Sequence, residues 1–148
     1  MTDWIDALWP FVRAHLPPKP AHVMEIGCGP EGGFVPALRD LGYDAVGVDP
    51  EAPAGPGYHR MPFEQYEPAG PVDAIVACTS LHHVDDLDTV LDRVAATLTG
   101  GGTLIVVEWA RERFDEATAR WCFERLPTTG EDGWLHRHRD QWRESGQP

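Results

Sequence analysis

The sequence predicts an α/β fold, a three-layer sandwich in which helices cover both faces of a mainly parallel β-sheet. Short apolar segments typical of strands alternate along the chain with amphipathic segments of helical spacing. Most of these strands are apolar throughout, as expected when helices cover both faces. The 148 residues suffice for one domain. No composition shift marks a linker, so we treat residues 1–148 as a single domain.

The expected elements follow in order. Helices are expected over residues 3–16, 34–41, 86–98 and 115–126, and strands over residues 22–26, 44–48, 58–61, 72–78 and 103–107. Pro10 should kink the first helix, and Gly42 should provide a left-handed C-cap for the second. Asp85 and Asp86 are interpreted as the N-cap and first-turn charge of the third helix, not as metal ligands. The glycines at 100–102 should end that helix. The domain then consists of an N-terminal helix at 3–16, a core at 21–108 and a helical tail at 109–148.

Charge and cysteine content exclude several classes of partner. The chain has 24 acidic and 12 basic residues, a net charge of −12, and such a surface repels nucleic acid and anionic membranes. No stretch reaches the roughly 18 to 20 apolar residues of a membrane span. The cysteines are odd in number, form no Cys-x-x-Cys pair and follow no secretory leader. These features predict a cytoplasmic protein.

A glycine-rich loop with a following acid predicts a nucleoside-containing ligand. Gly27, Gly29 and Gly32 lie between a strand and a helix, where glycine allows a ligand to approach the backbone. Asp49 ends the next strand, 22 residues after Gly27, where a carboxylate binds both hydroxyls of a ribose. The alternative is a tight turn with a loop-capping aspartate. Glu25 at the strand mouth should attract an ammonium group and repel a pyrophosphate, which favours S-adenosylmethionine over a nicotinamide dinucleotide.

Four segments together resemble the class I S-adenosylmethionine-dependent methyltransferases, over residues 23–108. They are Val-Met-Glu-Ile-Gly-Cys-Gly-Pro at 23–30, Val-Gly-Val-Asp-Pro at 46–50, the strand and Ser-Leu-His-His-Val-Asp-Asp run within 72–86, and Leu-Thr-Gly-Gly-Gly-Thr-Leu-Ile-Val-Val-Glu at 98–108. The resemblance implies a Rossmann-like sheet and S-adenosyl-L-methionine as the cofactor. Members of this family usually end the sheet with an antiparallel hairpin. The residues after 108 instead read as helix, loop and helix.

The resemblance also assigns roles to individual positions. It places Gly27, Cys28 and Gly29 beside the methionine part of the cofactor, Asp49 with Pro50 at the ribose, Phe63 against the adenine ring, Glu64 at the adenine amino group, and the backbone of Cys78 and Thr79 facing the cofactor. The alternative for Phe63 and Glu64 is a surface turn.

Candidate acceptor-binding groups lie after the strand at 72–78 and near the end of the chain. His82 or His83 is a candidate base, the alternative being a histidine that packs under its loop. The segment at 136–139, His-Arg-His-Arg, is either a basic lid over an anionic substrate or a solvated helical face. Three aromatic residues follow the strand at 103–107: Trp109, Phe114 and Trp121. They are expected either to line an acceptor pocket or to belong to the core. No metal site is predicted.

The predicted function is methyl transfer from S-adenosylmethionine to a small-molecule acceptor by in-line displacement. Two alternatives stay open: a non-catalytic module that binds the cofactor or supports a partner, and a nicotinamide-dependent oxidoreductase. The latter lacks a Tyr-x-x-x-Lys pair. The apolar strand at 103–107 should be covered by the C-terminal helices or by a second copy in a homodimer, because an open edge of this kind promotes aggregation.

Overall fold

The computed structural model describes residues 3–110, 113 and 115–124. The chain divides into two compact units, Met1–Glu108 and Trp109–Pro148, which are described separately. The first unit contains the sheet and the predicted glycine loop. The organisation of residues 1–148 as one domain stays a prediction.

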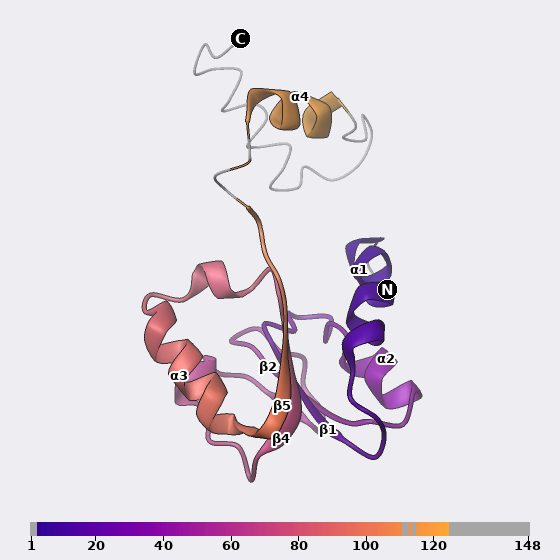
Figure 1. Ribbon diagram of the computed structural model, residues 1–148, viewed down its shortest axis with the longest axis vertical. Coiled ribbons are helices and arrows are strands. Elements are labelled where there is room, and N and C mark those ends of the chain that lie inside the picture. Colours follow the sequence, from indigo (N-terminus) through magenta and orange to yellow (C-terminus); the bar gives the residue numbers. More distant parts are fainter. Residues whose placement is uncertain (1–2, 111–112, 114, 125–148) are drawn as a thin grey trace. The chain divides into compact units, whose positions relative to one another are not determined.

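The first unit is built on a parallel sheet (Figure 1). Its strands are β1 (His22–Ile26), β2 (Asp44–Val48), β3 (Tyr58–His59), β4 (Val72–Cys78) and β5 (Leu98–Val107). They lie in the order β3-β2-β1-β4-β5, and every pairing is parallel. The chain reverses its direction of progress across the sheet between β1 and β4. Ligands of open α/β sheets bind outside the carboxyl ends of the strands at such a point.

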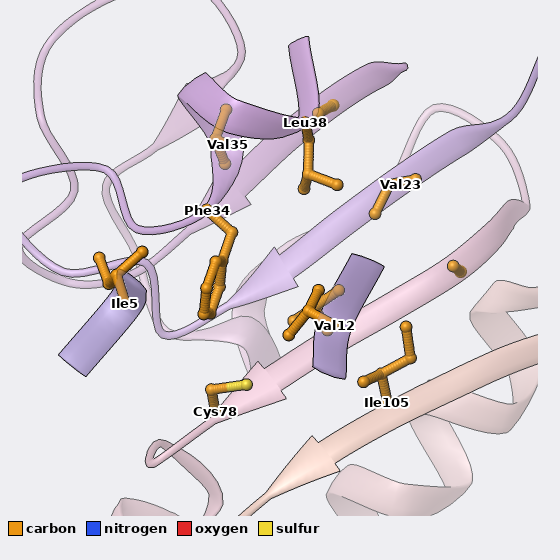
Figure 2. Packing of buried hydrophobic residues seen from close by; sticks show 11 residues of the cluster. Ile5, Val12, Val23, Phe34, Val35, Leu38, Cys78 and Ile105 are labelled. Atoms are coloured by element: carbon orange, nitrogen blue, oxygen red, sulfur yellow. The ribbon is translucent and has the colours of Figure 1, made fainter. Parts of the chain in front are cut away.

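Helices cover both faces of this sheet, which confirms the predicted three-layer fold. Helices α1 (Asp3–His15) and α2 (Val35–Asp40) lie on one face and α3 (Leu87–Thr97) on the other (Figure 1). Figure 2 shows the core on the α1 and α2 side, where Phe34 packs among residues of α1 and the strands. Val90 and Val94 of α3 pack on the opposite face against Met24 and Ile75. The burial of apolar strand residues on both faces explains why the strands are apolar throughout.

Most predicted boundaries agree with the structure, and β5 is the main exception. The strand begins at Leu98, not at 103, so the glycines expected to end the preceding helix lie within the strand segment. The pairing of β5 with β4 is irregular there, because Val72 lies opposite Leu98 whereas Ala74 lies opposite Thr103. Glycine suits such an irregular stretch as well as it suits a helix end. Gly101 has a φ of +91°, which a side chain would disfavour.

The predicted cap of α2 is found, and that of α3 is found one residue later than expected. Gly42 has a φ of +86° after α2. The side chain of Asp86 accepts a hydrogen bond of 3.0 Å from the backbone N–H of Thr89, which makes Asp86 the N-cap of α3. Asp85 lies before this cap, and the acidic residue of the first turn is Asp88. Pro10 lies inside α1.

In the part of the chain that the structure describes, β5 is an edge strand with no strand beyond it. Val106 on this strand is 38% exposed. The second unit contains α4 (Glu116–Glu124), which Asp115 caps through the N–H of Thr118 at 2.8 Å. The predicted helix at 115–126 thus agrees over its described length. No helix among the described residues has the length and apolar character needed to cross a membrane.

Candidate functional site

The glycine loop follows β1 and contacts the loop that follows β4. Gly27 has a φ of +82°, and a Cβ added there would lie 2.2 Å from the Cβ of Ser80. Ser80 in turn donates a hydrogen bond of 2.9 Å from its hydroxyl to the carbonyl of Ile26. Glycine at 27 is therefore required both by the backbone conformation and by the close approach of the two loops.

Asp49 fastens the glycine loop to the end of β2. Its Oδ2 accepts a 3.0 Å hydrogen bond from the N–H of Gly29, and its Oδ1 accepts one of 2.6 Å from the N–H of Glu51. An ionised carboxylate offers about four acceptor positions, so the two oxygens retain capacity for two further donors. A Cβ added at Gly29 would meet no atom within 4 Å. The backbone at Gly29 is thus open to a ligand beside a carboxylate that can accept two hydroxyl protons.

Glu25 holds the start of α2, and its predicted contact with an ammonium group of the cofactor stays a prediction. Its side chain is fully buried, and Oε2 accepts hydrogen bonds of 2.7 and 3.2 Å from the N–H groups of Phe34 and Val35 at the start of α2. Burial raises the pKa of Glu25 to about 8 despite these bonds, and the nearby charge of Asp49 adds to the increase. The carboxyl group of Glu25 therefore occupies the amide groups at the start of α2 that a pyrophosphate would need.

Cys28 and Gly32 are explained by the packing of the loop against β2 and β3. Cys28 is buried with its Sγ close to Gly47, and burial raises the pKa of its thiol to about 12. A Cβ added at Gly32 would lie 2.5 Å from the hydroxyl of Tyr58. Pro50 is exposed directly after Asp49. The contacts of Cys28, Gly32 and Pro50 with the cofactor stay predictions.

Phe63 and Glu64 are neighbours in sequence, but the first is buried and the second is exposed. The ring of Phe63 is buried in the core on the α3 side, with the guanidinium of Arg93 5.7 Å from its centroid. Glu64 is exposed. The alternative of a surface turn is thus wrong for Phe63, whose ring is a core group. The adenine contact of both residues stays a prediction.

The end of β4 carries an unusual backbone conformation. Thr79 has a φ of +52°, which is rare for a β-branched residue, and its N–H donates a 2.7 Å hydrogen bond to the carbonyl of Val107. Such conformations persist where the surrounding structure imposes them and are frequent at functional sites. Cys78 just before it is buried, which raises the pKa of its thiol to about 12. Neither cysteine of this sheet edge, Cys28 or Cys78, is activated as a nucleophile.

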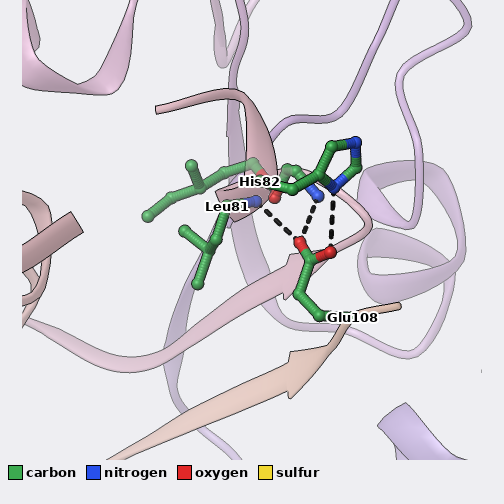
Figure 3. Close-up of polar contacts among 5 residues, drawn as sticks. Leu81, His82 and Glu108 are labelled. Atoms are coloured by element: carbon green, nitrogen blue, oxygen red, sulfur yellow. Dashed lines mark hydrogen bonds and ion pairs between the residues drawn. The ribbon is translucent and has the colours of Figure 1, made fainter. Parts of the chain in front are cut away.

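His82 is paired with a carboxylate that the sequence did not indicate as a site residue. Nδ1 of His82 lies 2.9 Å from Oε2 of Glu108, directly after β5, and Oε1 of Glu108 accepts hydrogen bonds of 2.7 Å from the N–H groups of Ser80 and Leu81 (Figure 3). Burial acts to raise the pKa of Glu108, but the hydrogen bonds from His82, Leu81 and Ser80 outweigh it and lower the pKa. The available signal was an acid directly after the apolar strand expected at 103–107; the pairing of β5 with β4, which brings this acid beside the loop of His82, is known only from the structure.

The second candidate base, His83, and the two tryptophans of the tail are exposed. The ring of His83 lies 4.0 Å from that of His82, centroid to centroid, and His83 is exposed. Trp109 and Trp121 are exposed on the second unit. Phe114 and the segment at 136–139 lie outside the described residues.

Comparison with known proteins identifies the family. A family model of the methyltransferase domain matches residues 1–143. Ubiquinone biosynthesis O-methyltransferase of Bradyrhizobium sp. (strain ORS 278) is 31% identical over 97 residues, which cover 57% of this chain and 38% of the relative. An S-adenosylmethionine dependent methyltransferase from Mesorhizobium loti aligns with a TM-score of 0.57 at 25% identity, covering 69% of this chain and 53% of the other.

A second similar structure is that of the plantazolicin methyltransferase BpumL in complex with pentazolic desmethylPZN analog and SAH. It aligns with a TM-score of 0.63 at 12% identity and covers 91% of this chain and 54% of the other. The chain thus spans about half the length of these two solved structures. It belongs to the methyltransferase-domain family, the S-adenosylmethionine-dependent methyltransferases that its motifs predict.

Proposed function

We propose that the protein transfers a methyl group from S-adenosylmethionine to a small-molecule acceptor. The observation that carries this proposal is the position of Asp49, which is hydrogen-bonded to Gly29 of the glycine loop and retains acceptor capacity for both ribose hydroxyls. Membership in the family supports the same conclusion.

The residues at this edge of the sheet suit a cationic nucleoside better than a dinucleotide. Glu25 already occupies the amide groups at the start of α2, so those groups are not available to a pyrophosphate. The open side of Gly29 lies beside the Asp49 carboxylate, which favours a ligand with hydroxyl groups and positive charge. This chemistry, together with the family, argues against the nicotinamide-dependent oxidoreductase.

We assign the cofactor contacts as the motifs suggest. Glu25 is placed near the ammonium group, and Gly27, Cys28 and Gly29 at the methionine part, with Gly32 in the same loop. Asp49 and Pro50 are placed at the ribose, Phe63 and Glu64 at the adenine, and the backbone of Cys78 and Thr79 across from them. Bound S-adenosylmethionine supplies an electrophilic methyl group on a sulfonium. The chain mainly contributes orientation, and in-line alignment of the reactants is worth roughly 7 to 11 kcal/mol.

The acceptor side is assigned to the loop after β4. His82 and His83 lie at the carboxyl ends of the strands, and His82 has the carboxylate partner expected of a base. The names of two similar proteins, one in ubiquinone biosynthesis and one acting on plantazolicin, support a small-molecule acceptor. We also propose that a second copy of the chain covers the edge of β5, because Val106 is exposed there.

Calorimetric titration with S-adenosylmethionine, S-adenosylhomocysteine and NADH tests the cofactor assignment. Asp49→Ala should weaken the binding of the two adenosyl compounds at least about tenfold, since a hydrogen bond to a charged group contributes roughly 1.5 to 3 kcal/mol. Asp44→Ala is the matched control, because Asp44 begins the same strand at the opposite edge of the sheet. Unchanged affinity in Asp49→Ala would refute the ribose assignment.

A non-catalytic module that binds the cofactor is the second candidate. It would give the same result in the calorimetric titration as the enzyme. The two are separated by incubating the protein with methyl-labelled S-adenosylmethionine and a panel of phenols, amines and thiols. Label transfer with release of S-adenosylhomocysteine supports the enzyme. Tight cofactor binding without transfer to any acceptor in the panel supports the binding module.

A further inference from the structure

Glu108 connects three groups of the loop after β4. One of its oxygens accepts hydrogen bonds from the N–H groups of Ser80 and Leu81, and the other lies 2.9 Å from Nδ1 of His82 (Figure 3). The side chains of His82 and Glu108 are 25% and 23% exposed, so the pair is partly buried and reachable from solvent. The same carboxylate therefore holds the loop and the imidazole.

This geometry determines which nitrogen of the neutral imidazole carries the proton. An ionised carboxylate only accepts hydrogen bonds, so Nδ1 of His82 must be the donor in this contact. The neutral ring then has its lone pair on Nε2, the nitrogen that faces away from Glu108. The partner of one ring nitrogen fixes the state of the other in this way in many histidine sites.

We propose that Glu108 is a positioning residue that holds His82 in the Nδ1–H tautomer, so that Nε2 removes a proton from a hydroxyl acceptor. This inference rests on the proposed methyl transfer and adds the chemical class of its acceptor. The hydroxyl oxygen forms the bond to the methyl carbon as the carbon–sulfur bond breaks, and the electron pair of that bond remains on sulfur. The hydroxyl proton passes to Nε2 of His82 and then to solvent.

A hydroxyl acceptor needs such a base more than a thiol does. A phenol has a pKa of about 10 and is almost entirely protonated at neutral pH, so its oxygen must lose a proton during transfer. A thiol, with a pKa of about 8.5, supplies part of its own anion. Glu108 also stabilises the imidazolium that forms, because its carboxylate lies in contact with Nδ1.

Glu108→Gln separates the positioning role from the support of the loop. The amide oxygen of glutamine can still accept from Ser80 and Leu81, because two N–H donors face that side. Its NH₂ group then faces Nδ1 of His82 and donates to it. The substitution should therefore preserve the loop and reverse the tautomer, which places the proton on Nε2 and removes the base.

Nitrogen-15 NMR of the histidine rings tests this directly, with the full chain at about pH 8.5, where an ordinary imidazole is neutral. His82 should be in the Nδ1–H form in the wild type and in the Nε2–H form in Glu108→Gln. Asp44→Asn is the matched control: it alters the exposed pair of His22 and Asp44, 2.8 Å apart at the other edge of the sheet. It should leave the His82 signals unchanged. A predominant Nε2–H form of His82 in the wild type would overturn the proposal without any variant.

The kinetic test uses two probe acceptors, phenol and a nitrophenol that is already ionised at the assay pH. Glu108→Gln should reduce kcat for phenol about 100-fold, the usual contribution of a general base, and for the nitrophenolate less than about threefold. KM for S-adenosylmethionine should not change. Equal losses with both acceptors would overturn the proposal. If the wild type binds the cofactor and methylates neither probe, the proposed function fails, whereas the tautomer measurement still decides the role of Glu108.

Discussion

The stability of the protein should depend on pH through Glu25. Its carboxyl group is buried beneath the start of α2, and burial raises its pKa from 4.5 to about 8. Between these two values the folded chain keeps a proton that the unfolded chain has lost. Stability from this group is therefore fully present below about pH 4.5 and is lost as the pH rises to about 8.

The expected magnitude follows from the size of the shift. Each pKa unit corresponds to about 1.4 kcal/mol, so the difference between 4.5 and about 8 amounts to about 5 kcal/mol. This is a large part of the roughly 5 to 15 kcal/mol of stability of an ordinary domain. Glu108, Asp86 and Asp115 act in the opposite direction at acid pH, because their pKa values are lowered. The wild-type profile alone thus combines several groups.

Glu25→Gln isolates the contribution of this one carboxyl group. Glutamine has the shape of the protonated acid, and its carbonyl oxygen can accept from Phe34 and Val35. The free energy of unfolding of the variant minus that of the wild type should rise by up to about 5 kcal/mol between pH 4.5 and 9. Urea denaturation followed by tryptophan fluorescence measures this difference.

A matched control comes from the same loop. Glu31 is exposed, so Glu31→Gln should change stability by no more than about 0.5 kcal/mol at every pH. A pH-independent difference between Glu25→Gln and the wild type would refute the reasoning, since it would mean that the buried carboxyl group titrates as in the unfolded chain.

Three further predictions concern other parts of the structure. Gly33→Ala should lower the free energy of unfolding, measured by urea denaturation, by about 3 kcal/mol, because the new Cβ would lie 2.2 Å from Oε1 of Glu25. Gly29→Ala has a similar φ but open space around the new Cβ, so it should lower the free energy of unfolding by about 1 kcal/mol. Equal losses in the two variants would contradict the packing explanation. Thr79→Asn should raise the unfolding free energy by about 1 kcal/mol, since asparagine tolerates its φ of +52°, and a loss of stability would speak against backbone strain there. Val106→Lys should shift sedimentation towards the monomer if β5 edges meet in a dimer, and a monomeric wild type would exclude that dimer.

The fold was predictable because its signals are local. β1, β2 and β4 have the predicted bounds, since each is a short apolar run ended by a glycine, proline or polar residue. The start of β5 was not predictable, because the glycines at 100–102 are compatible with a helix end and with an irregular strand. Only the pairing with β4 distinguishes the two.

The site was predictable in position and less so in its contacts. Asp49 could be predicted because its distance from Gly27 along the chain reflects one strand–helix–strand unit. The partners of Glu25 and Glu108 depend instead on the direction of a side chain and on the order of the strands. The spacing of residues along the sequence reveals neither property. It therefore does not indicate that Glu25 accepts from the N–H of Phe34 or that Glu108 contacts the ring of His82.

The three acids explain how irregular loops can form a well-ordered site at one edge of the sheet. Glu25, Asp49 and Glu108 come from different strands or strand ends, and each accepts backbone N–H groups of a loop or helix start. A loop without regular secondary structure leaves such N–H groups unpaired, and a carboxylate is their strongest side-chain acceptor. Asp49 and Glu108 also place negative charge at this edge of the sheet, whereas burial raises the pKa of Glu25 to about 8. Neutral replacements of these acids are therefore the most informative variants, because each one changes a group that holds a loop or a helix start in place.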